Sequence, residues 1–133
     1  LDTELESFPT TSGLTPKGNS LPDAPKFSGS LDARYRFNLS GDKFAEIAID
    51  AQYQDEVFRD ALNDPLLKSD SFWIVNARAS LYVSDQWEAT LWGKNLADEE
   101  YVVQGFNQVG LGNGYRVYGA PRTYGLTVTR LFE

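Results

Sequence analysis

The stretch that decides the fold is Gly119-Ala120-Pro121-Arg122-Thr123-Tyr124-Gly125-Leu126-Thr127-Val128-Thr129-Arg130-Leu131-Phe132. Successive side chains of a β-strand point to opposite faces. Counted back in twos from Phe132, one face is apolar and aromatic except for Arg130, and the other face is mostly small and polar. The pattern therefore predicts a last strand that ends in an aromatic anchor at a membrane interface, rather than a strand that covers a soluble core.

Four earlier stretches alternate in the same way: residues 27–39, 46–54, 73–83 and 87–94. Tight turns join the first stretch to the second and the third to the fourth, whereas long connections at 55–70 and 96–120 follow the second and the fourth. Strict alternation of short and long connections indicates an outer-membrane barrel, with short turns on the periplasmic side and long loops outside. Aromatic residues lie near the strand ends, as interfacial girdles require: Phe37, Tyr53, Trp73, Trp87, Tyr124 and Phe132.

The predicted fold is all-β, a fragment of an antiparallel transmembrane β-barrel with about five strands joined by alternating short turns and long loops. Roughly nine to eleven tilted residues cross the hydrocarbon core, and the alternating stretches have about that length. A closed membrane barrel needs about eight strands, and hydrocarbon does not tolerate unpaired strand edges. We therefore expect that the five strands do not close on their own, and that most of the barrel lies upstream in a longer protein.

The composition excludes several classes of function. The 133 residues include 12 Lys plus Arg and 19 Asp plus Glu, and the formal net charge of −7 argues against binding to nucleic acid. Cysteine and histidine are absent, which removes thiolate ligands, the commonest general base and the commonest transition-metal ligand. No run of about 18 apolar residues predicts a transmembrane helix. We predict no enzymatic activity, no cofactor and no metal site.

Two features of the long connections resemble ligand-binding motifs. Gly110-Leu111-Gly112-Asn113-Gly114 would need a helix N-terminus after it to hold a phosphate, and no helical pattern follows, so a flexible external loop is the favoured interpretation. The acidic residues between Asp55 and Asp64 offer oxygen ligands for calcium, but they lack EF-hand spacing. Such loop carboxylates are more often solvated than bound to a metal.

Three motifs resemble those of one family. Pro121-Arg122-Thr123-Tyr124-Gly125, followed by the strand that ends in Phe132, resembles the C-terminus of TonB-dependent outer-membrane receptors. Lys94-Asn95-Leu96-Ala97-Asp98-Glu99-Glu100-Tyr101 resembles the family's Asn-Leu-x-Asp-x-x-Tyr motif, and Gly18-Asn19-Ser20-Leu21-Pro22-Asp23-Ala24-Pro25-Lys26 resembles the loop that enters an earlier barrel strand. The matches occur in order over roughly residues 18–132. Two departures are Glu133 after the expected terminal Phe, and Arg130 at an outward position that is usually apolar or aromatic in the family.

The resemblance implies the C-terminal part of a large barrel in the bacterial outer membrane. Residues 1–24 would form an extracellular loop segment and residues 25–133 the last strands, with the plug domain absent. In the intact receptor, external loops capture a scarce ligand, often an iron–siderophore complex, and the TonB complex supplies the energy. The loops at 55–70 and 102–119 would be the places of ligand contact. Barrel-assembly machinery would read a terminal signal formed by Tyr124, Gly125, Leu126, Val128 and Phe132.

Charged side chains of both signs share the polar face of the predicted strands: Arg34, Arg36, Arg78, Lys94, Glu46, Asp50 and Glu88. They either line a lumen that contacts the plug and passes a solute, or pair across strands at about 0.2–1 kcal/mol each, and both interpretations can hold at once. Trp92 points to the same face, whereas Trp73 and Trp87 fall on the apolar face near strand ends. The candidate ligand contacts in the lumen are therefore Trp92, Arg34 and Arg78.

A second hypothesis is a small soluble β-barrel of lipocalin-like type that binds an apolar ligand inside. It also has alternating strands and hairpins, but its apolar face would point inward and its charged face to water. The alternation of long and short connections and the terminal Phe132 argue against it. Solubility without detergent would distinguish the two.

Overall fold

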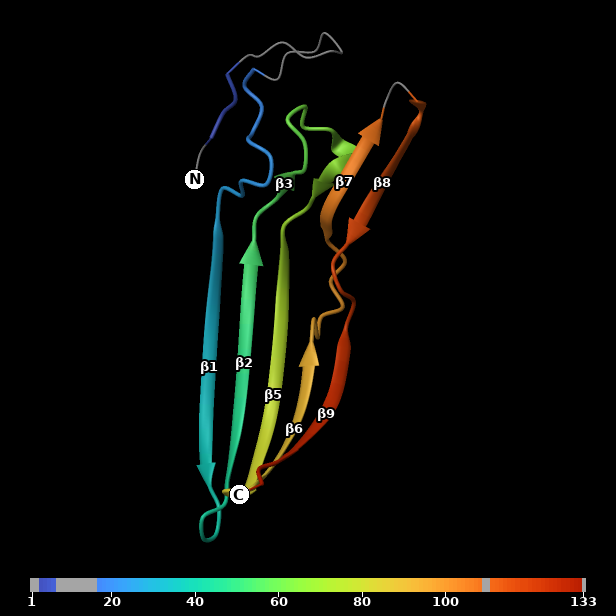
Figure 1. Cartoon of the computed structure of the whole chain (residues 1–133). Coiled ribbons are helices and arrows are strands. Elements are labelled where there is room, and N and C mark those ends of the chain that lie inside the picture. The colour runs from blue at the N-terminus through green and yellow to red at the C-terminus, as the bar shows by residue number, and fades with distance from the viewer. Residues whose placement is uncertain (1–2, 7–16, 109–110, 133) are drawn as a thin grey trace. The chain divides into compact units, whose positions relative to one another are not determined.

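The computed structural model describes residues 3–6, 17–108 and 111–132, and β-strands dominate this part of the chain (Figure 1). The strands are β1 (Ser28–Asn38), β2 (Phe44–Gln54), β3 (Val57–Phe58), β4 (Lys68–Ser69), β5 (Phe72–Ser84), β6 (Trp87–Lys94), β7 (Val102–Gln108), β8 (Asn113–Tyr118) and β9 (Thr123–Arg130). A short 3-10 helix, η1 (Pro65–Leu67), precedes β4. Within the described residues, no helix is both long enough and apolar enough to cross a membrane.

The chain divides into two compact units. One, here called the loop unit, comprises Leu1–Gly29, Tyr53–Phe72 and Glu100–Gly119. The other, the sheet unit, comprises Ser30–Gln52, Trp73–Glu99 and Ala120–Glu133.

The sheet unit is built from the five strands that the alternation predicts. They form one sheet in the order β1-β2-β5-β6-β9, so neighbours along the sheet follow the chain order of these strands. The sheet leaves β1 and β9 as edge strands, and the prediction of an unclosed antiparallel all-β fragment is confirmed. The fifth strand is shorter than expected, because β9 ends at Arg130 and Phe132 lies beyond it.

Both faces of the sheet are open to their surroundings. Every residue of β1 is exposed, and the exposed apolar side chains of the sheet include Leu31 at 68%, Leu126 at 69% and Tyr124 at 80%. Such a large exposed apolar face is characteristic of a surface that meets lipid or a partner, rather than water. The other face carries the polar and charged side chains of the same strands.

The loop unit contains short strands that the sequence analysis did not predict. The connections 55–70 and 96–120 were expected to be loops, but the first contains the β3–β4 pair with η1, and the second contains the β7–β8 hairpin. The predicted flexible loop at 110–114 is partly β8, since Asn113 pairs with Gln108 and Gly114 with Asn107, and Gly110 lies outside the described residues. Gly114 is required there, because a Cβ at this position would lie 2.8 Å from the carbonyl oxygen of Phe106.

A small core and side-chain hydrogen bonds hold the loop unit together. Val57, Leu67 and Val102 are 3–5% exposed, and the ring of Phe72 stacks on that of Tyr101 at 4.4 Å between centroids. Arg59 donates from Nε to the carbonyl of Val102 at 3.1 Å. The same guanidinium pairs with Asp23 at 2.6 Å, so one side chain ties together three segments of the loop unit.

The turn after β6 is organised by Asn95, which is 4% exposed. Its Nδ2 donates to the carbonyls of Glu99 and Ala120 at 2.9 and 3.0 Å, and its Oδ1 accepts from the backbone N–H of Glu99 at 2.9 Å. Its φ of 49° lies in the left-handed region, which asparagine tolerates better than most residues. The turn brings Leu96 back beside Gly93, where a Cβ would lie 2.6 Å from Leu96 Cδ2.

The turn also connects two of the sequence motifs. Asp98 accepts a hydrogen bond from the backbone N–H of Arg122 at 3.0 Å and forms an ion pair with its guanidinium at 3.4 Å. Together with the Asn95 bond to Ala120, this contact holds the segment immediately before β9 against the end of β6. We call this set of contacts at Asn95 and Asp98 the β6–β9 latch.

Replacing Asn95 by Ala should destabilise the protein by about 2–4 kcal/mol, because it removes three hydrogen bonds of a nearly buried side chain. The measurement is urea unfolding in detergent micelles, with the folded fraction followed by the gel migration of unheated samples. Asp98→Asn is the matched control. It retains an acceptor for Arg122 N–H and loses only a half-exposed ion pair, so its cost should stay below about 1 kcal/mol. Equal losses of unfolding free energy in the two variants would show that the hydrogen bonds of Asn95 do not hold this turn.

Candidate functional site

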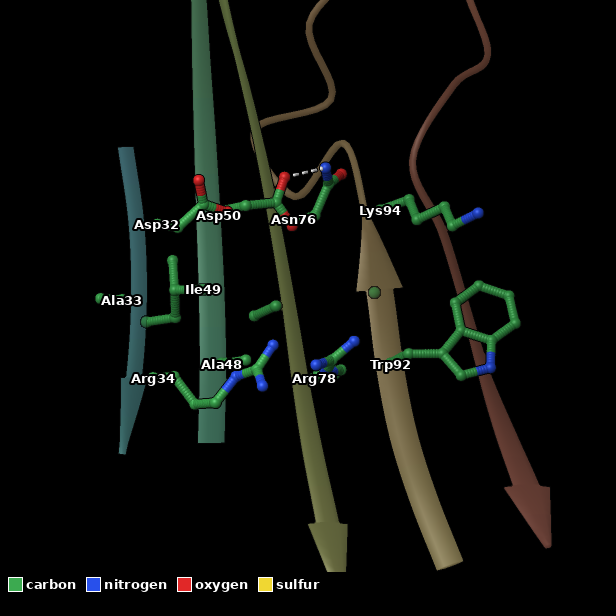
Figure 2. A pocket seen from close by; sticks show the side chains of 12 residues that line it. Asp32, Ala33, Arg34, Ala48, Ile49, Asp50, Asn76, Arg78, Trp92 and Lys94 are labelled. Carbon is green, nitrogen blue, oxygen red and sulfur yellow. Dashed lines mark hydrogen bonds between the residues drawn. The ribbon is translucent and has the colours of Figure 1, made fainter. Parts of the chain in front are cut away.

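The polar face of the sheet unit contains a concave site of about 470 Å³ (Figure 2). Its lining side chains come from β1, β2, β5 and β6, and include Asp32, Arg34, Ala48, Asp50, Asn76, Arg78, Trp92 and Lys94. In Figure 2, Asp32, Asp50, Asn76 and Lys94 lie at one level of the sheet, and Arg34, Ala48, Arg78 and Trp92 at the next. The site is therefore a row with two carboxylates followed by a row with two guanidinium groups.

Glu46 forms ion pairs with three arginines of the polar face. It lies on β2, and its side chain is 7% exposed because three arginines surround it. Arg34 Nε and Arg36 Nη2 each lie 3.5 Å from a Glu46 oxygen, and Arg78 Nη2 lies 3.7 Å away. The arginines themselves remain about half or more exposed, at 48–63% of the side chain.

This cluster carries more positive than negative charge. Three guanidinium groups share one carboxylate, so two positive charges are left without a counter-ion in the cluster. A guanidinium presents up to five N–H donors in a planar fork that matches carboxylates and phosphates. The exposed edges of Arg34 and Arg78 can therefore bind an anionic group that enters the hollow.

A polar network crosses the adjacent row. Asn76 Nδ2 donates to Asp50 Oδ2 at 2.6 Å, the bond drawn in Figure 2, and Asn76 Oδ1 accepts from the backbone N–H of Asn95 at 2.9 Å. Asn95 in turn binds the carbonyl of Ala120. The network connects β2, β5, the turn after β6 and the segment before β9, so the carboxylate row of the site is hydrogen-bonded to the β6–β9 latch.

Trp92 lies over Gly125 on the next strand. The two residues are register partners, and a Cβ at Gly125 would lie 2.5 Å from Trp92 Cζ2. The indole Nε1 donates to Thr127 Oγ1 at 3.2 Å, and Lys94 Nζ lies 5.8 Å from the ring centroid. Because glycine leaves room for the ring, the indole packs flat along the polar face and borders the hollow.

A second pocket, of about 470 Å³, lies within the loop unit. Leu66 and Leu67 line it from the connection 55–70, and residues 106–107 and 112–116 line it from the β7–β8 hairpin. Phe106 and Tyr115 contribute rings 6.2 Å apart, and Arg116 contributes the only charged group of the lining. The two connections that the sequence suggested for ligand contact thus border one pocket.

The acidic residues of the connection 55–70 accept hydrogen bonds from backbone and side-chain donors. Asp60 accepts from the backbone N–H groups of Asp64 and Leu62, and Asp64 accepts from Leu66 N–H and from the Asn107 side chain. In the described part of the chain, no group of three or more potential metal ligands comes together. Hydrogen bonds from Lys68 to Glu56 and Asp70 raise the pKa of Lys68. The ion pair between Lys68 and Glu56 also connects β4 to the residue before β3.

The structure brings the three candidate lumen residues together. Arg34 and Arg78 share Glu46, and Trp92 is the register partner of Arg78. Their role as ligand contacts stays a prediction. Sequence reasoning treated Glu46 only as one charge among several and missed the latch function of Asn95. A signal for Asn95 was present, because it opens the motif 95–101 directly after a strand.

The residues of the predicted assembly signal fall on both faces. Tyr124, Leu126 and Val128 are exposed on the apolar face at 80%, 69% and 58%, and Phe132 is 79% exposed beyond the end of β9. Gly125 lies on the polar face beneath Trp92. The signal role is untested, but Gly125 has a packing role of its own.

We expect Gly125→Ala to destabilise the folded protein by about 1–3 kcal/mol, because the new methyl group forces the Trp92 ring away and breaks its bond to Thr127. In a Trp92→Ala background the same substitution should destabilise the protein by less than about 0.5 kcal/mol, because the ring that the methyl group would displace is absent. The free-energy changes of two contacting residues are not additive. Urea unfolding of the four proteins in micelles measures the coupling. Equal costs in both backgrounds would show that the ring does not depend on Gly125.

We expect Glu46→Gln to lower stability by about 1–2 kcal/mol, because three guanidinium groups would then repel one another without a carboxylate. The loss should shrink at high salt, which screens the repulsion between these half-exposed groups. Unfolding midpoints at about 0.05 and 1 M salt provide the test. A loss that does not change with salt would indicate packing rather than charge.

Comparisons with known proteins agree with this architecture. The sequence model of the family described as TonB dependent receptor-like, beta-barrel matches residues 2–96. The crystal structure of the siderophore receptor PiuA from Acinetobacter baumannii matches 92% of this chain with a TM-score of 0.71 and 22% sequence identity. The chain spans 16% of the length of that receptor, and at this identity the likeness shows the fold alone.

The family match covers more than half of the chain, and the exposed apolar face of the sheet agrees with a wall that faces lipid. The family is one of transport proteins and not of enzymes, and its barrels reside in the bacterial outer membrane. This chain belongs to the TonB-dependent receptor β-barrel family and forms part of the barrel.

Proposed function

We propose that the chain is the C-terminal part of the barrel of a receptor that actively takes up a scarce ligand such as an iron–siderophore complex. The observation that carries this proposal is the pocket of the loop unit, which residues 66–67 and the β7–β8 hairpin build together. In a transmembrane barrel the longer loops lie on the extracellular side, where a receptor meets its ligand. The siderophore receptor in the structural comparison supports the choice of ligand class.

The chemistry of this pocket fits an anionic ligand with flat apolar groups. Phe106 and Tyr115 offer ring faces, and Arg116 offers a cation without an opposing carboxylate in the lining. The hollow on the polar face, with Arg34, Arg78 and Trp92, repeats the same combination of guanidinium and aromatic groups. Each of the two sites thus offers a guanidinium group and an aromatic ring to an anionic solute.

The remaining parts of the proposal follow the family architecture. Residues 1–24 are an extracellular loop segment, and residues 25–133 are the last strands of the barrel. A plug domain, the TonB complex and the barrel-assembly machinery are the partners of the intact receptor, and the polar face is the surface that the plug meets. The soluble lipocalin-like alternative is not retained, because the family match places the chain in a membrane barrel.

The test is uptake of radioactive iron by iron-starved cells of the source organism, supplied as ferric catecholate, ferric hydroxamate or ferric citrate. Deleting the gene for the intact receptor should abolish uptake of at least one of these probes, and the wild-type gene should restore it. Uptake of all three at wild-type rates in the deletion strain would overturn the proposed ligand class.

Substitutions then locate the contacts. Arg116→Ala should weaken binding of the transported probe to whole cells about threefold to tenfold, which corresponds to the net contribution of one hydrogen bond, about 0.6–1.4 kcal/mol. Arg78→Ala should leave surface binding intact and slow internalisation by a similar factor. Asp42→Asn, in the turn between β1 and β2, is the control and should change neither. Barrel abundance in the outer membrane is measured for each variant, so that loss of assembly is distinguished from loss of transport.

A further inference from the structure

Arg130 is the charged exception on the apolar face of the sheet, and it lies against two aromatic rings. Its Cζ is 5.2 Å from the ring centroid of Trp87, its register partner on β6, and 4.7 Å from that of Phe132. Its neighbours on the same face of β9 are Val128 and Leu126, both exposed. The guanidinium therefore has aromatic and apolar surroundings on a face that meets lipid.

Arg130 also differs from the arginines of the polar face in the charges that surround it. Arg34, Arg36 and Arg78 all pair with Glu46. Among the residues that the structure describes, no carboxylate lies within ion-pair distance of Arg130. A guanidinium on a lipid-facing surface is stabilised by an anionic partner, because an unpaired charge is costly in a medium of low polarity.

The position of Arg130 along the strand places it at the membrane interface. It is the last residue of β9 and Trp87 is the first of β6, at the end of the sheet where the short turns lie (Figure 1). An arginine on the lipid face of a barrel costs about 2–4 kcal/mol at the bilayer midplane and about 0–1 kcal/mol near the interface. Aromatic girdle residues mark the level of the lipid headgroups. Arg130 thus lies at the level of lipid phosphates, on the periplasmic side.

We propose that Arg130, Trp87 and Phe132 form a binding site for the phosphodiester of an anionic phospholipid in the periplasmic leaflet. The rings of Trp87 and Phe132 hold the guanidinium by cation–π contact, and its N–H groups remain able to donate to two phosphate oxygens. The acyl chains of the same lipid then lie along the exposed side chains of Leu126 and Val128. This inference rests on membership of the barrel family and not on the transported ligand.

The experiment uses the intact receptor, purified in mild detergent and incubated with equimolar phosphatidylglycerol and phosphatidylcholine. Native mass spectrometry counts the lipid molecules that remain bound. Wild-type protein should retain phosphatidylglycerol at least about threefold more than Arg130→Gln, and Arg130→Lys should lie between them because lysine keeps the charge but not the planar fork. Millimolar inorganic phosphate should not displace the lipid, since the acyl chains contribute to binding.

Arg36→Gln is the matched control. The Arg36 guanidinium also lies over an aromatic ring, 4.3 Å from the centroid of Phe44, but it is on the polar face and pairs with Glu46. Its replacement should leave phosphatidylglycerol retention unchanged. Equal retention by wild type, Arg130→Gln and Arg130→Lys would overturn the proposal, as would an equal loss for Arg36→Gln. Gel migration of unheated samples confirms that each variant is folded.

Discussion

The register between β6 and β9 is the constraint on which the rest of the sheet unit depends. Because the side-chain period of a strand is two, a slip by one residue would exchange the lipid face of β9 for its polar face. Asn95 prevents such a slip by binding the carbonyl of Ala120, and Asp98 adds a contact to the backbone of Arg122. These contacts are made immediately before β9 begins, so the strand enters the sheet with its register already set. The buried hydrogen bonds of one asparagine therefore determine which side chains of the last strand meet lipid.

The same register has consequences on both faces. On the polar face it places Gly125 beside Trp92, and the missing Cβ lets the indole lie along the wall. On the apolar face it places Arg130 beside Trp87, where the ring holds the guanidinium. A glycine weakens a strand, an arginine is unfavourable on a lipid face, and each is accommodated here by an aromatic partner on β6. Aromatic residues on the penultimate strand thus compensate for two irregular residues on the last one.

The period-two pattern was sufficient to predict the five strands of the sheet and their faces, because each strand is exposed to two different environments along its whole length. It failed in the connections 55–70 and 96–120, where β3, β4, β7 and β8 are short and are stabilised by contacts between segments distant in the sequence. The bond from Arg59 to Val102 is of this kind and has no local signature. The cluster around Glu46 could not be predicted either. The alternation shows which face of the sheet a charged side chain lies on, but not which side chains of the neighbouring strands it contacts.

The proposed passage of an anionic solute along the polar face agrees with the placement of Glu46 among three arginines. A purely cationic wall would hold an anionic solute or an acidic plug segment too strongly, whereas passage requires contacts that are favourable but weak enough to leave. One nearly buried carboxylate keeps the arginine side chains in place and cancels part of their charge, while their outer edges stay exposed. Asp32 and Asp50 lie at the adjacent level and reduce the net charge further. On this proposal the polar face offers an anion several weakly attractive positions. The hydrogen bonds of Asp50, Asn76 and Asn95 connect the carboxylate level of that face to the segment before the last strand.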